Sequence, residues 1–463
     1  MVRKETLLIA LLALALAGLL SACNTLFSPP KPNPVALSAP TDASVPVDPG
    51  GSHTLTLTLQ DTAKRVEVRV ALADPCAKST ANCPGWDASR YPGVTHPTGT
   101  YTLDGANPRV DLLFQVAADA LPQGPYKYEI QVRDAEGNEW VAPFYLKIRD
   151  PRGRPALEAL ADWRQRAGLP GVREDLEWSW RGWLHSRYAI QNYPDNLPHD
   201  EDLSQPFATL EGKEAARGNE WGFLYRWNGQ PRFPPEEQSV NWWITAPFHR
   251  FPLVYPWEMT LGHGIYRDVG PIPGSGDGYG RSYANLPNLS PWTSDRPIRD
   301  VLFPTPGMRV PLNRYAGREN PNPTYPCTNP SAPPRRPYLT QEGLTWDDGA
   351  GRVVTPIGFP VTVMTFAQRD TEVLEARLKR LSDGQANPVC AYGSLQYWED
   401  REFWRNRGIA GLKGYGAVVV LPHQPLTPGY AYEVYIRARV GDQERSWTWQ
   451  FQVDREMVPL NEP

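Results

Sequence analysis

The chain has 463 residues, which is too long for one hydrophobic core because single domains usually stop growing at about 250 to 300 residues, so we expect two or three domains. The formal net charge of -4 at pH 7 excludes a broad cationic surface that would bind nucleic acid or anionic lipid by charge alone. The 50 prolines and 17 tryptophans predict many turns, long ordered loops and aromatic side chains available for binding.

The first 22 residues have the parts of an export signal. Arg3 and Lys4 precede an apolar run over residues 6–20, which is shorter than the roughly 20 residues that a spanning helix needs, and small residues follow. The stretch Leu20-Ser21-Ala22-Cys23 resembles the bacterial lipobox, in which the signal is cut before the cysteine and lipid is attached to its sulfur. We expect a lipoprotein of the bacterial cell envelope, held outside the cytoplasm by lipid on Cys23. Ordinary secretion with Cys23 removed is the alternative.

Four further cysteines form an even set in an exported chain, which favours two disulfides over a metal site. Of the three pairings, we favour Cys76 with Cys83 and Cys327 with Cys390, because each pair then lies within one predicted domain. No CxxC spacing occurs, so a structural zinc is not expected.

Residues 23–51 are rich in Pro, Ser, Ala and Asn and predict an extended tether. Apolar residues then alternate with polar ones in several runs, among them Leu55 to Leu59, Val66 to Val70 and Tyr126 to Val132. This period of two indicates antiparallel strands. The region 52–150 is therefore predicted to be a small immunoglobulin-like β-sandwich.

The spacing becomes helical after Pro151. A first helix is predicted from Leu157 to Ala167, ended by Gly168 to Gly171, and a second follows the capping residue Asp175, with a stripe of Leu176, Trp180, Trp183, Leu184 and Tyr188. Ser239 is expected to cap a third helix, which Pro247 breaks. Residues 151–300 are thus predicted to form an α+β domain.

The alternation returns in the last third of the chain, at 353–357, 361–366, 373–381, 418–421, 430–440 and 447–453. The turn Pro425 to Gly429, followed by Tyr-x-Tyr-x-Val and Trp-x-Trp-x-Phe strands, resembles bacterial immunoglobulin-like modules. A second all-β sandwich is predicted over 301–456, with a tail at 457–463.

The middle region carries a recognisable series of motifs. They are Trp163-Arg164, Gly168-Leu169-Pro170, His185-Ser186-Arg187-Tyr188, His199-Asp200-Glu201, Thr209-Leu210-Glu211-Gly212 and Trp243-Ile244-Thr245-Ala246-Pro247-Phe248-His249-Arg250. Together they resemble the bacterial branch of the CAP superfamily, which is named for cysteine-rich secretory, antigen-like and pathogenesis-related proteins. The resemblance implies an α-β-α sandwich with a surface cleft where two histidines and one or two glutamates converge, sometimes around a divalent metal.

Carried over to this sequence, the resemblance assigns His199 and His249 as the cleft histidines and favours Glu220 as the glutamate, with Glu201 and Glu211 as lesser candidates. Two imidazoles and a carboxylate would also make an incomplete zinc site with one position open. Alternatively, His249 simply binds backbone carbonyls and holds its loop in place.

Two other histidines lie near these motifs. We interpret His185 as a core histidine with satisfied hydrogen bonds, because it lies beside the apolar stripe of its helix. His263 stands between two glycines and either approaches the cleft from a strand or lies elsewhere. The glycine-rich stretch 274–280 lacks the lysine of a phosphate loop and is interpreted as a rim loop.

Three functions follow from this organisation. The first is a non-enzymatic binding protein of the envelope, whose cleft takes a glycan, a lipid or a protein. The second is a metal-assisted hydrolase of peptide or cell-wall material, with His199 and His249 as zinc ligands and Glu220 or Glu201 as the base. The third is a purely structural protein.

Overall fold

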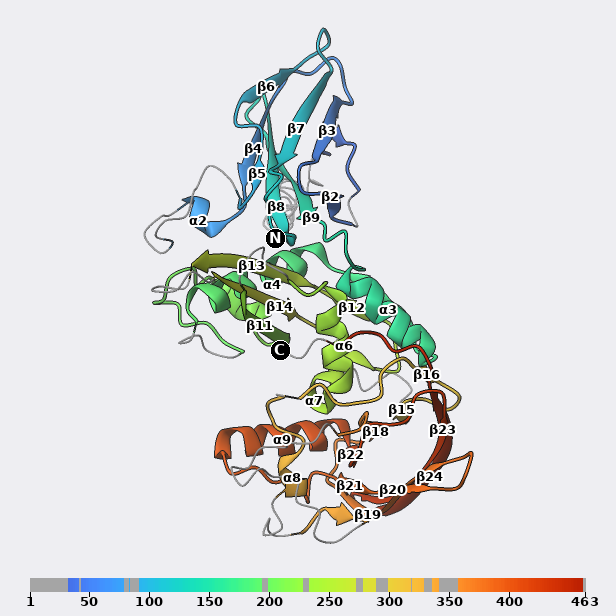
Figure 1. The fold of residues 1–463 in the computed structure, drawn as a ribbon. Coiled ribbons are helices and arrows are strands. Elements are labelled where there is room, and N and C mark those ends of the chain that lie inside the picture. The colour runs from blue at the N-terminus through green and yellow to red at the C-terminus, as the bar shows by residue number, and fades with distance from the viewer. Residues whose placement is uncertain are drawn as a thin grey trace, which may run out of the picture.

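The computed structural model describes residues 32–40, 43–78, 83, 91–193, 199–227, 233–271, 278–288, 299–317, 319–328, 335–340 and 357–460. The export signal, Cys23, the strand residues expected at 353–356 and most of the predicted rim loop lie outside these ranges. The described chain is mainly β and stacks in three tiers, with the N-terminal strands at one end, helices in the middle and the C-terminal strands at the other end (Figure 1). Among the described helices, none is both long and apolar enough to cross a membrane.

The N-terminal tier is a sandwich of two sheets, as predicted, but its first strand begins at Val35 and not near residue 52. The prediction of a tether over 23–51 is therefore wrong from Val35 onward, because short strands there pair with the edges of both sheets. One sheet has the order β1 (Val35–Leu37), β3 (Ser52–Leu59), β7 (Arg109–Val116) and β5 (Val94–Thr95). The other runs through β2 (Val45–Val47), β9 (Glu139–Ile148), β8 (Gln123–Asp134), β4 (Val66–Leu72) and β6 (Thr100–Leu103). Alternate residues such as Leu55, Leu57 and Leu59 are buried between the sheets, which is the reason for the period of two.

A short side loop joins this sandwich to the middle tier. It begins with α2 (Pro75–Lys78) and is closed by the predicted Cys76–Cys83 disulfide, with Cα atoms 5.7 Å apart. Beside it, the buried Asp74 carboxylate forms an ion pair with the equally buried Arg187 guanidinium. The disulfide therefore closes the loop, and the ion pair links its start to the helix that carries Arg187.

The two long middle helices form where the sequence predicts them. The first, α3 (Ala156–Arg166), ends before Gly168, which has a φ of 63°. The second, α4 (Leu176–Gln191), is capped by Asp175, whose side chain accepts a hydrogen bond from the Trp178 amide at 3.1 Å. The predicted stripe along α4 is buried throughout.

The prediction for the third helix is wrong at its start. α6 (Glu237–Thr245) begins before Ser239, whose hydroxyl donates to the Glu236 carbonyl at 2.8 Å instead of accepting from a backbone amide. Pro247 does break this helix, and it stands in the first turn of α7 (Pro247–Arg250). The short 3-10 turn η2 (Phe251–Leu253) follows directly.

A three-stranded antiparallel sheet supports these helices. Its order is β11 (Asn219–Trp227), β14 (Gly278–Leu286) and β13 (Gly264–Pro271), with α4 packed against β13 and β14 and α6 against β11. Ile265 of β13 also pairs with Gly124 of β8, so this sheet continues the second sheet of the N-terminal sandwich. The helix α5 (Leu210–Ala215) packs beside α4, and β10 (Val172–Glu174) pairs with β12 (Met259–Leu261).

The C-terminal tier contains two five-stranded sheets. The first has the order β15 (Val301–Phe303), β18 (Val361–Met364), β22 (Ala417–Pro422), β21 (Val389–Tyr392) and β17 (Tyr338–Leu339). The second has the order β16 (Arg309–Val310), β24 (Gln443–Val453), β23 (Ala431–Val440), β19 (Thr371–Arg380) and β20 (Ala386–Asn387). The predicted Cys327–Cys390 disulfide joins α8 (Tyr325–Thr328) to β21.

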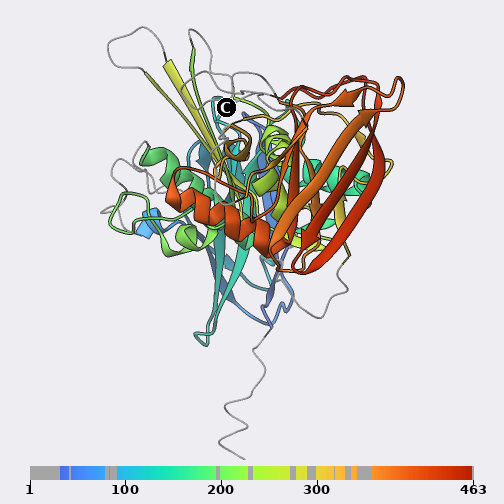
Figure 2. The same ribbon diagram turned by 90° about the horizontal axis from the view of Figure 1, so that it is seen from below.

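One long helix of this tier was not predicted from the sequence. α9 (Glu402–Tyr415) crosses the face of the molecule that Figure 2 presents. It buries only Gly408 and Leu412, so it lacks the broad apolar stripe by which the other helices were recognised. Gly408 is needed because a Cβ there would collide with the Tyr397 ring.

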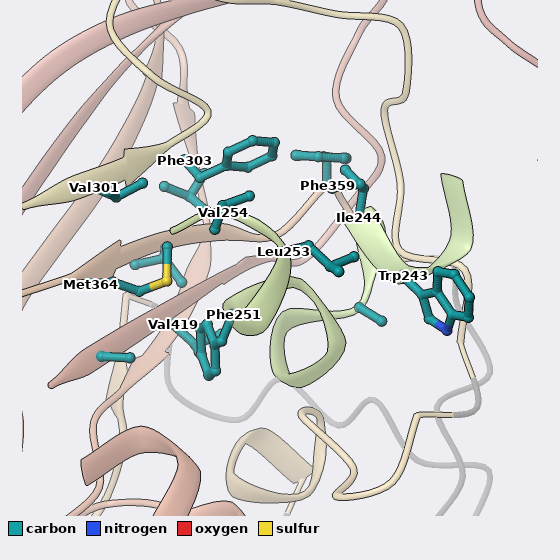
Figure 3. Close-up of a cluster of buried hydrophobic side chains, with 14 of the residues drawn as sticks. Trp243, Ile244, Phe251, Leu253, Val254, Val301, Phe303, Phe359, Met364 and Val419 are labelled. Carbon is teal, nitrogen blue, oxygen red and sulfur yellow. The ribbon is translucent and has the colours of Figure 1, made fainter. Parts of the chain in front are cut away.

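The hydrophobic cores cross the boundaries predicted at 150 and 300. Residues of α4 share a core with the N-terminal sandwich, whereas those of α3, α6, α7 and β12 share one with the C-terminal sheets. Figure 3 shows this second core, in which Phe251 and Leu253 lie near Met364 and Val419. The middle tier therefore shares one hydrophobic core with the N-terminal sandwich and another with the C-terminal sheets.

Candidate functional site

A buried histidine between two glutamates lies at the centre of the middle tier. His185, on α4, is fully buried, and its Nδ1 lies 3.0 Å from Glu201 Oε1 while its Nε2 lies 2.9 Å from Glu220 Oε1. This geometry agrees with the interpretation of His185 as a core histidine. The sequence did not predict its partners, because Glu201 and Glu220 were assigned to the cleft.

Each of these carboxylates has further donors. Glu201 accepts from the Thr209 amide at 2.7 Å, and Glu220 accepts from the Tyr283 hydroxyl at 2.8 Å and from the His199 amide at 3.0 Å. A charge this deeply buried is tolerated only when it is paired and hydrogen-bonded. The Glu201–His185–Glu220 cluster therefore links α4 to β11 and to the segment that carries His199.

The pKa values in the cluster follow from this arrangement. Burial acts to lower the pKa of His185, but hydrogen bonds to Glu201 and Glu220 outweigh it and raise the pKa to about 9. Burial raises the pKa of Glu201. Burial also acts to raise the pKa of Glu220, but the protonated form that His199 takes in acid and the hydrogen bond from His185 outweigh burial and lower this pKa. His185 is consequently an imidazolium at neutral pH and donates from both nitrogens.

His199 is held above this cluster in an uncommon backbone conformation, with a φ of 58°. Its amide donates to Glu220, and its Nδ1 lies 3.1 Å from the Gly218 carbonyl oxygen, which makes Nδ1 the protonated nitrogen. Burial lowers the pKa of His199, and the nearby His249 and Arg407 lower it further. The neutral ring therefore keeps a lone pair on Nε2.

His249 has a carboxylate partner that comes from much later in the chain. Its amide and its Nδ1 both donate to Glu319 Oε1, at 2.8 and 2.9 Å. Glu319 is 1% exposed, and burial raises its pKa. The His249 ring also meets the Trp242 ring edge to face, with the centroids 5.1 Å apart. The alternative in which His249 only binds backbone carbonyls is therefore wrong.

The two cleft histidines line one small cavity of about 170 Å³. Arg217, Asn219 and Asn320 contribute polar groups to its wall, and Trp404 and Arg407 reach it from α9. The remaining walls are Gly218, Phe248, Phe251, Pro321, Gly411 and Tyr415. The cavity thus lies at the junction of the middle and C-terminal tiers, which brings together His199 and His249 as predicted.

The residues present do not fit the metal site that the CAP resemblance implies. Within the described ranges, no three His, Cys, Asp or Glu side chains are grouped so that they could hold a metal ion. Catalytic zinc usually has three protein ligands, and Glu220, the expected third, is already bonded to His185, His199 and Tyr283. These side chains therefore do not form the metal site that the resemblance implies.

The favoured glutamate, Glu220, and the three lesser candidates do not line this cavity. Glu201 and Glu220 stand behind it in the His185 cluster. Glu211, in the first turn of α5, is half-buried, and no hydrogen bond or ion pair joins it to that cluster. His263 lines a different cavity, beside Glu236, so the expectation that it approaches the His199 cleft is wrong.

Three further residues of the site were not predicted from the sequence. Glu319 and Arg407 belong to the region that was expected to be a separate module, and neither stands in a recognisable motif. Arg217 lies three residues before Glu220, the glutamate favoured from the sequence, and this proximity was a signal that could have found it.

Comparisons with known proteins give no family for this chain. No protein-family model matches it, and no curated protein sequence does. Among solved structures, the periplasmic chaperone SfaE is 17% identical over 28% of this chain and 64% of its own length, with a TM-score of 0.21. The YadV chaperone is 6% identical over 90% of this chain and 100% of its own, with a TM-score of 0.20. A fragment of the ICAM-5 ectodomain is 10% identical, covers 90% of this chain and 76% of its own, and has a TM-score of 0.15. TM-scores this low carry no argument about fold or function.

Proposed function

We propose that this chain is an extracytoplasmic lipoprotein of the bacterial envelope, whose CAP-like middle region binds a ligand and whose flanking modules are immunoglobulin-like. The lipobox-like Leu20-Ser21-Ala22-Cys23 supports the anchor, and two disulfides suit an oxidising compartment outside the cytoplasm. The histidines that the CAP resemblance selects, His199 and His249, line one cavity, which supports the binding role.

One observation carries the choice of ligand. Arg217 and Arg407 line the cavity together with His199 and His249, and no acidic side chain is among the described lining residues. The carboxylate of Glu220 binds the backbone amide of His199, and the carboxylate of Glu319 binds the amide and the imidazole of His249. A carboxylate or phosphate group on a glycan, lipid or protein ligand matches this wall, because guanidinium groups bind such anions through paired hydrogen bonds.

The hydrolase alternative has less support. Its general base would be Glu220 or Glu201, but both carboxylates are hydrogen-bonded to His185 and neither lines the cavity. A general base must come within hydrogen-bonding reach of the proton that it removes. The described geometry therefore favours binding over hydrolysis.

The anion-binding proposal predicts that the double variant Arg217→Ala, Arg407→Ala loses at least about tenfold in affinity for inorganic phosphate or acetate, since each charged hydrogen bond contributes roughly 1.5 to 3 kcal/mol. Calorimetric titration of the wild type and the variant measures this loss. The same titration on His199→Ala, His249→Ala should show a similar loss.

The matched control replaces Arg109 and Arg377, two arginines with exposed side chains that lie outside the cavity, and it should leave the affinity unchanged. If neither anion binds to the wild type, or if the control loses as much affinity as the cavity variant, the proposed ligand class is wrong.

The lipid anchor proposed at Cys23 can be tested with the variant Cys23→Ser. Two or three acyl chains on Cys23 hold a protein far more durably than one chain, and serine offers no sulfur for them. The variant should therefore move from the membrane fraction to the soluble fraction, as measured by immunoblotting after cell fractionation. Retention of Cys23→Ser in the membrane fraction would contradict the lipid anchor, while Cys83→Ser serves as the control that should remain bound.

A further inference from the structure

His263 lies at the other junction of the middle tier, between β12 and β13, and two glycines decide where its side chain goes. A Cβ on Gly262 or Gly264 would collide with the backbone of α4, so the chain passes very close to this helix. The His263 amide donates to the Ser179 hydroxyl of α4 at 2.9 Å. The imidazole therefore leaves on the side away from α4, where it lines a cavity.

The His263 ring is buried, but its nitrogens have no hydrogen-bond partner among the described residues. Only 2% of the residue is exposed. Burial lowers its pKa to about 3, and the charge of Lys147 acts in the same direction. At neutral pH the ring thus presents one N–H donor and one nitrogen acceptor, both unused. Such a group costs stability, so it calls for an explanation.

The cavity has the size of a small-molecule site. It measures about 450 Å³, within the range of about 300 to 1,000 Å³ that is typical of such sites, and it lies between the N-terminal sandwich and the helices of the middle tier. Pro46 and Leu157 supply apolar wall, and Glu174 and Glu236 supply carboxylates near His263. The His263 Nδ1 lies 4.0 Å from Glu236 Oε2.

The positive charges around this cavity are already paired. Each cation in its wall has a carboxylate partner: Lys147 binds Glu236 at 2.6 Å, Arg149 binds Asp48 at 2.7 Å and Arg154 binds Glu237 at 3.0 Å. An added anion would have to displace one of these carboxylate partners. A neutral ligand that both donates and accepts hydrogen bonds has no such cost, and hydroxyl groups meet this requirement.

We propose that this cavity is a second binding site, which takes an uncharged polyhydroxy ligand such as a monosaccharide or a polyol. One hydroxyl pairs with a free ring nitrogen of His263, and its neighbour on the ligand bonds to the Lys147–Glu236 ion pair. This site is separate from the His199 cavity and does not depend on the function proposed for it.

The test follows the ring ¹⁵N signals of His263 in histidine-labelled protein, assigned by their disappearance in His263→Leu. Adding N-acetylglucosamine, glucose or glycerol should shift these signals, whereas inorganic phosphate should not. His263→Leu should weaken binding of the shifting compound at least about tenfold, because a buried hydrogen bond is lost. His263→Asn, which keeps a donor and an acceptor, should weaken it less.

If His263 only stabilised the fold, its replacement by leucine would make the protein easier to unfold, and we expect the opposite. Without ligand, His263→Leu should unfold at the same urea concentration as the wild type or a higher one, because leucine removes an unpaired buried polar group. If none of the three compounds shifts the wild-type ring signals, or if His263→Leu binds the compound as tightly as the wild type, the second site does not exist.

Discussion

Replacing His185 by leucine is expected to lower the free energy of unfolding by about 3 to 5 kcal/mol, the usual effect of removing one partner from a buried ion pair. The imidazolium lies between Glu201 and Glu220, and leucine would leave both carboxylates facing an apolar side chain. Burial already raises the pKa of Glu201, so the loss of its partner would force it to take up a proton or to rearrange. Urea unfolding at pH 7 measures the change.

His263→Leu is a matched control for this experiment, since both histidines are buried but His263 has no hydrogen-bond partner among the described residues. His263→Leu should change the free energy of unfolding only slightly. The difference between the two variants therefore separates the loss of an ion pair from the loss of imidazole volume. Adding Glu201→Gln and Glu220→Gln to His185→Leu should restore part of the stability, because the effects of substitutions at contacting residues on the free energy of unfolding do not simply add. Equal losses for His185→Leu and His263→Leu would contradict the role of the cluster.

The stability of the wild type is expected to fall as the pH rises from 6.5 to about 9. A histidine whose pKa is raised on folding contributes stability that is complete below its unfolded pKa of 6.5 and is lost as the pH passes the folded value, about 9 for His185. At 1.36 kcal/mol per pKa unit, the difference corresponds to at most about 3 kcal/mol. Unfolding curves in urea at several pH values measure this slope.

Three neighbouring groups do not contribute to this loss of stability at alkaline pH. Burial raises the pKa of Tyr283 far above the window, and the lowered pKa values of His199 and Glu220 affect stability only on the acid side. His185→Leu should therefore have a flatter profile between pH 6.5 and 9. A wild-type stability that stays constant or rises over this range would show that His185 is not held as an imidazolium.

Local patterns predicted most of the strands and the first two middle helices because their causes are local. The alternation in β3 and the stripe of α4 record which face of each element is buried. The pattern failed for α9, whose narrow buried face carries Gly408 where other helices carry large apolar residues. Its position beside Tyr397 depends on packing, which no local spacing expresses.

The sequence by itself determined the residue types of the site, the pairing of the four cysteines and the positions of most elements, because caps, periodicity and short motifs act over a few residues. Only the tertiary structure decided that Glu319 and Arg407 join His249 and His199, that Glu201 and Glu220 serve His185, and that His263 faces a separate cavity. These contacts join segments that are far apart in the chain, and they are set by how the sheets and helices pack on one another.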